Sequence, residues 1–144
     1  MPTSDLDDAI REYRLLHEEV PIPTRLPTSE EVDAVQAQLG VCFHPDLRTF
    51  LLRASDVHYG NMEPVTLTKP DSHTFLPRVC GHAWDRWDIP RELVPICADN
   101  ANYHCLTPDG QVVYWGHDDG EVTATWTSLA DWIREVLIEE QQDR

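Results

Sequence analysis

The chain has 144 residues, of which 41% are hydrophobic and 26% charged, a balance typical of one packed globular domain over residues 1–144 rather than of a disordered chain. Its 26 acidic and 11 basic residues give a formal net charge of −15, which argues against nucleic acid as a ligand, since polyanions are bound through Lys and Arg. A basic partner protein would instead be attracted. No apolar run of about 18 residues occurs and the N-terminal segment is acidic, so we expect a cytoplasmic protein without membrane association.

The N-terminal third begins with the pattern of a helix. Ser4 can cap this helix, and Asp7 and Asp8 would stand in its first turn, where the helix dipole favours acidic side chains. Apolar or aromatic positions recur at helical spacing at Leu6, Ile10, Tyr13 and His17. The three prolines of residues 20–27 then predict an extended connector.

A second and a third helix follow the connector. Thr28 and Glu31 form a T-x-x-E capping box, and Gly40 offers a left-handed stop for the second helix. Pro45 occupies a first-turn position of the third helix. The apolar face of that helix is predicted to comprise Leu47, Phe50, Leu51 and Ala54.

The remainder of the chain has the pattern of strands and one closing helix. We expect a short strand over residues 64–68 and a short helix around Trp84 and Trp87. A meander of four strands is predicted over residues 92–98, 102–107, 111–116 and 121–126. A last helix, capped by Thr127 or Ser128, has a helical apolar stripe at Leu129, Trp132, Ile133, Val136 and Leu137. This order predicts an α+β fold, with N-terminal helices and a C-terminal helix packed on a mostly antiparallel sheet.

Residues that could carry chemistry are few. The cysteines have no Cys-x-x-Cys spacing and are expected to be buried, reduced thiols; they are Cys42, Cys80, Cys97 and Cys105. The segment 117–121, HDDGE, is predicted to be a solvated hairpin turn, with a partner-facing acidic tip and a cation site as the alternatives. We expect no metal, no cofactor and no catalysis. Three tryptophans fit either the core or an exposed anchor position: Trp84, Trp87 and Trp115.

Three segments together resemble a known family. They are LPTSEEVDAVQAQLGVCFHPDLRTFLLRAS, IPRELVPICADNANYHCLTPDGQVVYWGHDDGE and TSLADWI, and with the variable segments between them the resemblance extends over residues 26 to about 134. Their order and spacing resemble the SUKH superfamily, in the branch similar to the yeast Smi/Knr cell-wall regulator. The resemblance implies an α+β fold with a central antiparallel sheet and no catalysis. In bacteria it implies an immunity protein, which binds and neutralises a toxin, often a nuclease, of a polymorphic or contact-dependent system.

The acidic character of the chain agrees with a partner that has a basic surface, such as a nuclease toxin. We predict that the free protein is a monomer or a weak homodimer. The predicted contact surface comprises Asp99, Asn102, Asp118, Asp119 and Glu121 on the hairpin tips, with Asp56 and Tyr59 from the first long loop. The alternatives are a regulatory scaffold similar to the yeast relative, and a small metal-dependent hydrolase that uses His104, Cys105 or the 117–121 turn.

Overall fold

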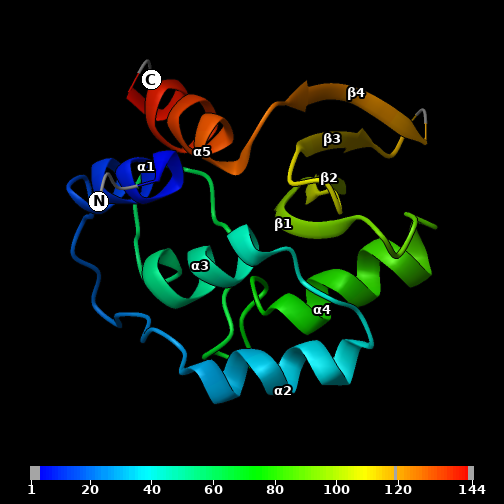
Figure 1. Cartoon of the computed structure of the whole chain (residues 1–144), viewed down its shortest axis with the longest axis horizontal. Helices are drawn as coiled ribbons and strands as arrows, with labels where there is room; N and C mark the ends of the chain where they lie inside the picture. The colour runs from blue at the N-terminus through cyan, green and yellow to red at the C-terminus, as the bar shows by residue number, and fades with distance from the viewer. Residues whose placement is uncertain (1–3, 119, 143–144) are drawn as a thin grey trace.

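The computed structural model describes residues 4–118 and 120–142 (Figure 1). Its helices are α1 (Asp5–Arg14), α2 (Ser29–Leu39), α3 (Pro45–Ala54), α4 (Leu76–Gly81), η1 (His82–Arg86), α5 (Leu129–Trp132), η2 (Ile133–Glu139) and α6 (Glu140–Gln142). Its strands are β1 (Val94–Asp99), β2 (Asn102–Leu106), β3 (Val112–Gly116) and β4 (Glu121–Trp126). The predicted α+β fold is confirmed, with the helices at both ends of the chain and an antiparallel meander between them.

The predicted helix caps are present. Ser4 and Asp7 form a reciprocal capping box at α1, in which the Ser4 hydroxyl accepts from the Asp7 N–H at 3.1 Å. Thr28 and Glu31 do the same at α2, and Gly40 ends that helix with a φ of 68°. Helix α1 ends at Arg14, so His17, which the spacing placed in this helix, lies beyond it.

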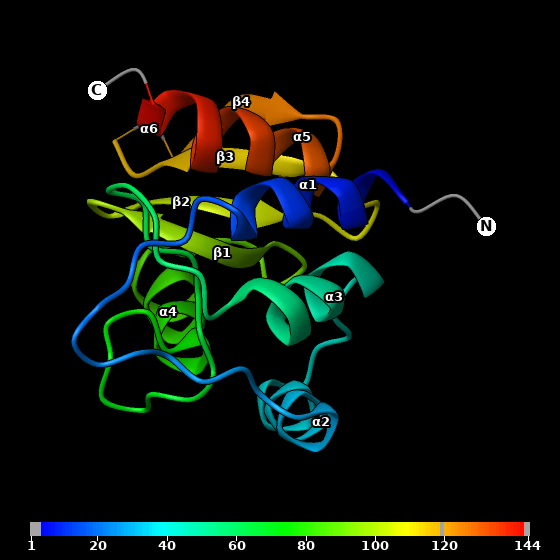
Figure 2. The same cartoon turned by 90° about the vertical axis from the view of Figure 1, so that its left-hand side faces the viewer.

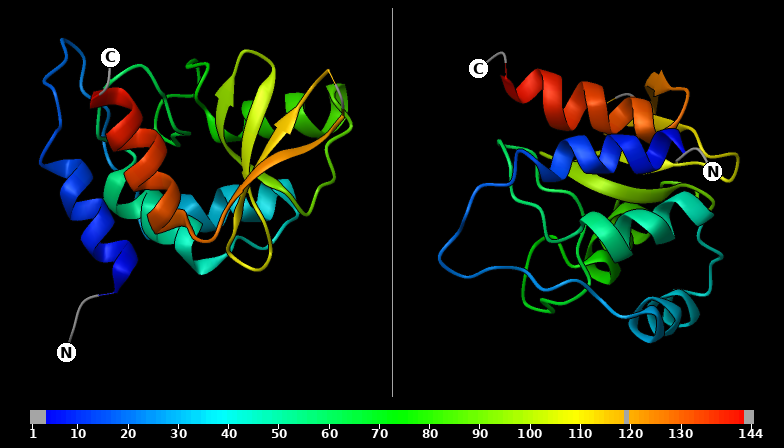
Figure 3. Two further views of the ribbon diagram at one scale, coloured as in Figure 1. Left: turned by 90° about the horizontal axis from the view of Figure 1, so that it is seen from above. Right: turned by 60° about the vertical axis from the view of Figure 1, so that its left-hand side comes forward.

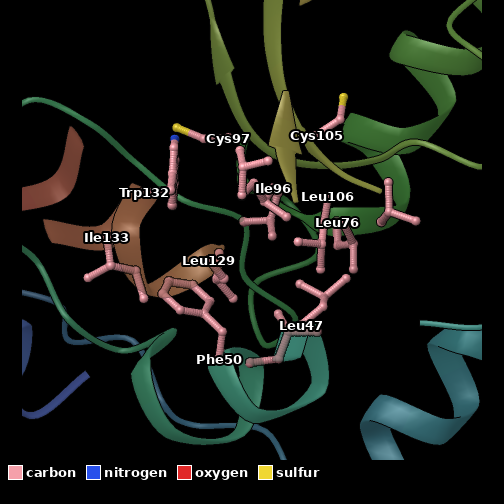
Figure 4. Close-up of a cluster of buried hydrophobic side chains, with 14 of the residues drawn as sticks. Leu47, Phe50, Leu76, Ile96, Cys97, Cys105, Leu106, Leu129, Trp132 and Ile133 are labelled. Carbon is pink, nitrogen blue, oxygen red and sulfur yellow. The ribbon is translucent and has the colours of Figure 1, made fainter. Parts of the chain in front are cut away.

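Helix α3 supplies one side of the hydrophobic core. All four predicted apolar residues of this helix are buried. Figure 4 shows Leu47 and Phe50 of α3 pointing toward Leu106 of β2 and Leu129 of α5. The predicted apolar stripe of the C-terminal helix is buried as well, so the two ends of the chain and the sheet share a single core.

The four strands pair in the order β1-β2-β3-β4, and every pairing is antiparallel. Successive residues of a strand point to opposite faces of a sheet. In β2, His104 accepts a hydrogen bond from Trp132 of the C-terminal helix, whereas the neighbouring Cys105 points toward α4 (Figure 4). Helices therefore cover both faces of the sheet: in Figure 2, α4 lies below β1 and the C-terminal helix lies alongside β3 and β4.

The strand predicted over residues 64–68 is wrong. This segment forms only two isolated bridges, Pro64 with Cys97 and Thr66 with Phe75. Its backbone divides its hydrogen bonds between two partners, because Val65 donates to the carbonyl of Ile96 whereas the next residue donates to Thr74. A segment that changes partner after one residue cannot build a ladder.

The helix predicted around Trp84 and the helix predicted at the C-terminus both contain a π-helical stretch. The short helix expected around Trp84 starts earlier, at Leu76, and continues as the π-helical turn η1. The last helix is capped by Ser128, whose hydroxyl accepts from the Asp131 N–H at 3.1 Å, and it winds as a π-helix from Ile133. None of the described helices is long and apolar enough to cross a lipid bilayer.

Candidate functional site

The β1–β2 hairpin and the β3–β4 hairpin turn at the same end of the sheet, because four antiparallel strands in sequential order alternate in direction. We call this region the hairpin end. Its side chains are Asp99, Asn102, Tyr114, His117, Asp118 and Glu121. In Figures 1 and 3 the β3–β4 hairpin lies on the side of the molecule opposite to α1.

His117 joins the two hairpins. The side-chain carbonyl of Asn102 accepts from the His117 backbone N–H at 2.9 Å, and it lies 2.7 Å from the ring Nδ1 of the same residue. The other ring nitrogen, Nε2, lies 3.0 Å from a carboxylate oxygen of Asp118. One half-buried histidine therefore positions an amide from the first hairpin and an acid from the second.

A second cross-strand pair holds Asp99. The Tyr114 hydroxyl donates to Asp99 Oδ2 at 3.1 Å, which links β3 to the end of β1. Burial raises the pKa of Tyr114 above its usual value, so the phenol keeps its proton and acts as a donor. The Asp99 carboxylate is thereby fixed at the surface instead of rotating freely.

The turn between β1 and β2 is tight and left-handed. Asn100 has a φ of 50° and Ala101 a φ of 72°, a pair of positive values that suits a two-residue hairpin. The turn predicted at this point is confirmed. Ala101 has a Cβ atom, so its left-handed conformation costs about 1–2 kcal/mol that glycine would not incur.

Aromatic side chains border the hairpin end. The ring of Trp87 lies 5.5 Å from that of His117, centroid to centroid, and the guanidinium of Arg86 lies 5.8 Å from the Trp87 ring. Trp87 is half-buried, whereas Trp84 and Trp115 are buried in the core. Of the three tryptophans with open assignments, Trp87 alone is thus placed next to the acidic surface.

The acids of the second hairpin face solvent. The Asp118 side chain is 86% exposed, and Glu121 is exposed at the start of β4, opposite Gly116. The predicted contact residue Asp119 lies outside the described residues. Asp118 and Glu121, with the fixed Asp99, make the hairpin end a negatively charged surface.

The two predicted contact residues of the first long loop lie elsewhere. Asp56 forms an ion pair with Arg14 of α1, with nitrogen–oxygen distances of 2.5 and 3.2 Å. Tyr59 lines a cavity of about 350 Å³ in the same loop region. The structure therefore brings Asp99, Asn102, Asp118 and Glu121 together. It places Asp56 against α1 and Tyr59 at the loop cavity.

Sequence reasoning missed two members of the hairpin end and the tryptophan that borders it. Tyr114, His117 and Trp87 were not singled out as contact residues, although His117 stands next to Asp118 in the chain. Tyr114 could have been found from the strand register. Tyr114 pairs with His104, and His104 lies two residues after Asn102, so the three side chains share one face of the sheet. The contact of Trp87 depends on how η1, which ends just before it, packs against the second hairpin, and no local pattern encodes this packing.

Two of the residues considered for an enzyme, His104 and Cys105, are buried. His104 is 4% exposed, and burial lowers its pKa to about 4, so its imidazole is neutral at pH 7. Burial raises the pKa of the Cys105 thiol, and it raises those of Cys80 and Cys97 to about 12. Among the described residues, no three His, Cys, Asp or Glu side chains converge to hold a metal ion.

The prediction of buried thiols is wrong for Cys42, which is exposed. Cys42 lies in the link between α2 and α3. In this extended link alternate side chains point outward, and its neighbour Phe43 takes the buried position.

Comparisons with known proteins point to one family. The SUKH_5 family model, described as SMI1-KNR4 cell-wall, matches residues 6–138. The chain is similar to a protein from Pseudomonas syringae pv. tomato of known crystal structure, with 42% sequence identity and a TM-score of 0.84. That match covers 90% of this chain and 96% of the other. The search of curated proteins found no significant match.

Proposed function

This chain belongs to the SUKH family, in its SMI1-KNR4 group, and on that basis we propose that it is an immunity protein. It binds a cognate protein toxin, blocks the surface that the toxin uses, and catalyses no reaction itself. It acts in the cytoplasm as a free monomer or weak homodimer. The observation that carries the proposal is the hairpin end, an acidic surface bordered by the half-buried Trp87. Hydrogen bonds hold Asp99 and Asn102 there, and the acids Asp118 and Glu121 are exposed beside them.

Charge supports a basic partner. A toxin that cleaves nucleic acid needs a positively charged surface to hold phosphates. A chain with a net charge of −15 is drawn to such a surface, and the attraction raises the association rate. Asp99, Asp118 and Glu121 of the hairpin end then stand where substrate phosphates would otherwise bind.

Rigidity and aromatic area support binding by the same surface. Interface residues that are already ordered lose less conformational entropy on association. The bonds of Tyr114 to Asp99 and of His117 to Asn102 order this surface in the free protein. Trp87 adds a half-buried indole, the type of side chain that is enriched at the centre of interfaces.

A growth assay tests the proposal. The proposal places the gene of the cognate toxin beside the gene for this chain, and the toxin domain encoded there is expressed in a bacterial host, with and without this protein. We expect the wild-type chain to restore growth and the double variant Asp118→Lys/Glu121→Lys to fail. Glu30→Lys, which changes one exposed acid of α2, is a control for charge reversal elsewhere on the surface and should protect as well as wild type.

Two results would reject the proposal. One is a wild-type chain that gives no protection although it is folded and expressed. The other is full protection by the double variant, which would show that the hairpin end does not contact the toxin. A regulatory scaffold similar to the yeast Smi/Knr cell-wall regulator would produce the first of these results.

A further inference from the structure

The two edge strands of the sheet, β1 and β4, differ in whether their outer backbone groups are paired. The β1 edge is closed, because the Val65 N–H donates to the carbonyl of Ile96 at 2.9 Å and Pro95 has no N–H to offer. The β4 edge is open, since within the described residues β4 pairs with β3 alone. Every residue from Glu121 to Thr125 is exposed. An open edge presents backbone groups that an extended chain can pair with.

Strand β4 lacks most of the features that protect natural edges. Its sequence, EVTATW, contains no Lys and no Pro, and Val122 is 45% exposed. The irregularity of the β3–β4 pairing lies between Tyr114 and Trp115, so it affects only the first half of β4. Residues 124–126 pair regularly with β3, and their other edge is open within the described residues.

An acidic groove lies beside this regular half. It has a volume of about 410 Å³ and is lined by Thr125, Trp126, Thr127, Asp131, Arg134, Glu135 and Glu139. The single base, Arg134, is already engaged by Asp5 at 2.7 Å and Glu12 at 2.8 Å. The carboxylates of Asp131 and Glu139 are exposed and have no side-chain partner within the described part of the chain. The groove therefore offers uncompensated negative charge next to open backbone.

We propose that β4 receives an extended segment of the partner protein as a fifth strand, and that Lys or Arg side chains of this segment occupy the acidic groove. The proposal rests on the proposed function, in which the partner is a basic toxin. Charge selects this occupant over a second copy of the chain. Two copies joined edge to edge would bring together two molecules with a net charge of −15 each and two acidic grooves.

The test uses a short peptide of alternating Lys and Thr as the probe. A second peptide has the same sequence, with N-methyl groups on alternate residues, so that it keeps its charge but loses the amides of one edge. We expect the first peptide to slow hydrogen exchange of the β4 amides about tenfold at saturation, and the methylated peptide to bind about tenfold more weakly. The double variant Asp131→Asn/Glu139→Gln should also bind the first peptide about tenfold more weakly, whereas Glu30→Gln should not.

Equal binding of the two peptides, or unchanged exchange in β4, overturns the proposal. Hydrogen exchange of the toxin complex distinguishes a failure of the strand-addition proposal from a failure of the proposed immunity function. If the toxin is neutralised while the β4 amides exchange as in the free protein, the strand-addition proposal is wrong and the immunity function stands. If the peptide protects β4 but the toxin is not bound, the open edge is a docking site and the immunity function is wrong.

Discussion

The indole N–H of Trp132 donates a hydrogen bond to Nδ1 of His104 at 3.0 Å, in the interior of the protein. Trp132 is fully buried and His104 is 4% exposed, so neither group has water as an alternative partner. The rings of Tyr114 and Trp126 also lie 4.7 and 5.5 Å from the imidazole, centroid to centroid. This bond ties the C-terminal helix to the centre of the sheet, and it requires His104 to be neutral.

Stability should fall as the pH drops below the ordinary histidine range. Burial lowers the pKa of His104 from 6.5 to about 4. Between these pH values His104 is protonated in the unfolded chain but not in the folded chain. The free energy of unfolding therefore decreases as the pH falls, by about 3 kcal/mol in all. The lowered pKa of Glu31, about 2, makes its own contribution only below pH 4.5.

Urea unfolding at pH 7.5, 6.5 and 5.5 measures this effect. His73→Gln, which changes an exposed histidine, should keep the pH slope. His104→Gln should make the slope shallower and leave the part that comes from His58, whose pKa burial also lowers. If His104→Gln does not fold, an NMR titration of the wild-type imidazole decides instead. A His104 pKa at or above 6.5 would contradict the account.

Removing the indole donor should destabilise the protein more than an equivalent change at the surface. Trp132→Phe leaves the buried Nδ1 of His104 without a partner and opens a small cavity, which together cost about 2–4 kcal/mol. Trp126→Phe is the matched control: Trp126 is half-buried and donates to the exposed Glu135, and we expect a loss of about 1 kcal/mol. Chemical denaturation measures both, and equal losses would contradict the assigned role of Trp132.

Replacing one strained residue should stabilise the hairpin end. Ala101→Gly removes the Cβ atom from a residue with a φ of 72°, and we expect a gain of about 0.5–1 kcal/mol after the greater flexibility of glycine in the unfolded chain is counted. Ala98→Gly, in the regular part of β1, should lower stability. Thermal unfolding compares the two. A loss of stability in Ala101→Gly would show that the turn does not hold this residue under strain.

Local signals predicted most of the fold. Helix caps and stops act within one turn of their own helix, so the sequence alone predicts them. Examples are the caps at Ser4 and Thr28 and the stop at Gly40. The four strands and the C-terminal stripe follow from alternation and helical spacing. The segment over 64–68 failed because its two bridging partners, near Phe75 and Cys97, are distant in the chain.

The hairpin end was predicted in part. Its acids were identified because turns between strands expose polar residues. The contacts of His117 with Asn102 and with Trp87 depend on how the two hairpins and η1 pack, which no local pattern encodes. The first-loop residues Asp56 and Tyr59 were grouped with the tips on their residue types alone, and the ion pair of Asp56 with Arg14 could not be read from the sequence.

The most direct measurement of the central claim is the dissociation constant of this chain with its proposed cognate toxin domain, at low and high salt. If the chain works by binding a basic partner through its hairpin end, Asp118→Lys/Glu121→Lys should weaken binding at least about tenfold at low salt, with a smaller difference at high salt. Glu30→Lys should bind within about twofold of wild type. An unchanged dissociation constant for the double variant, or no binding by the wild-type chain, would contradict the account.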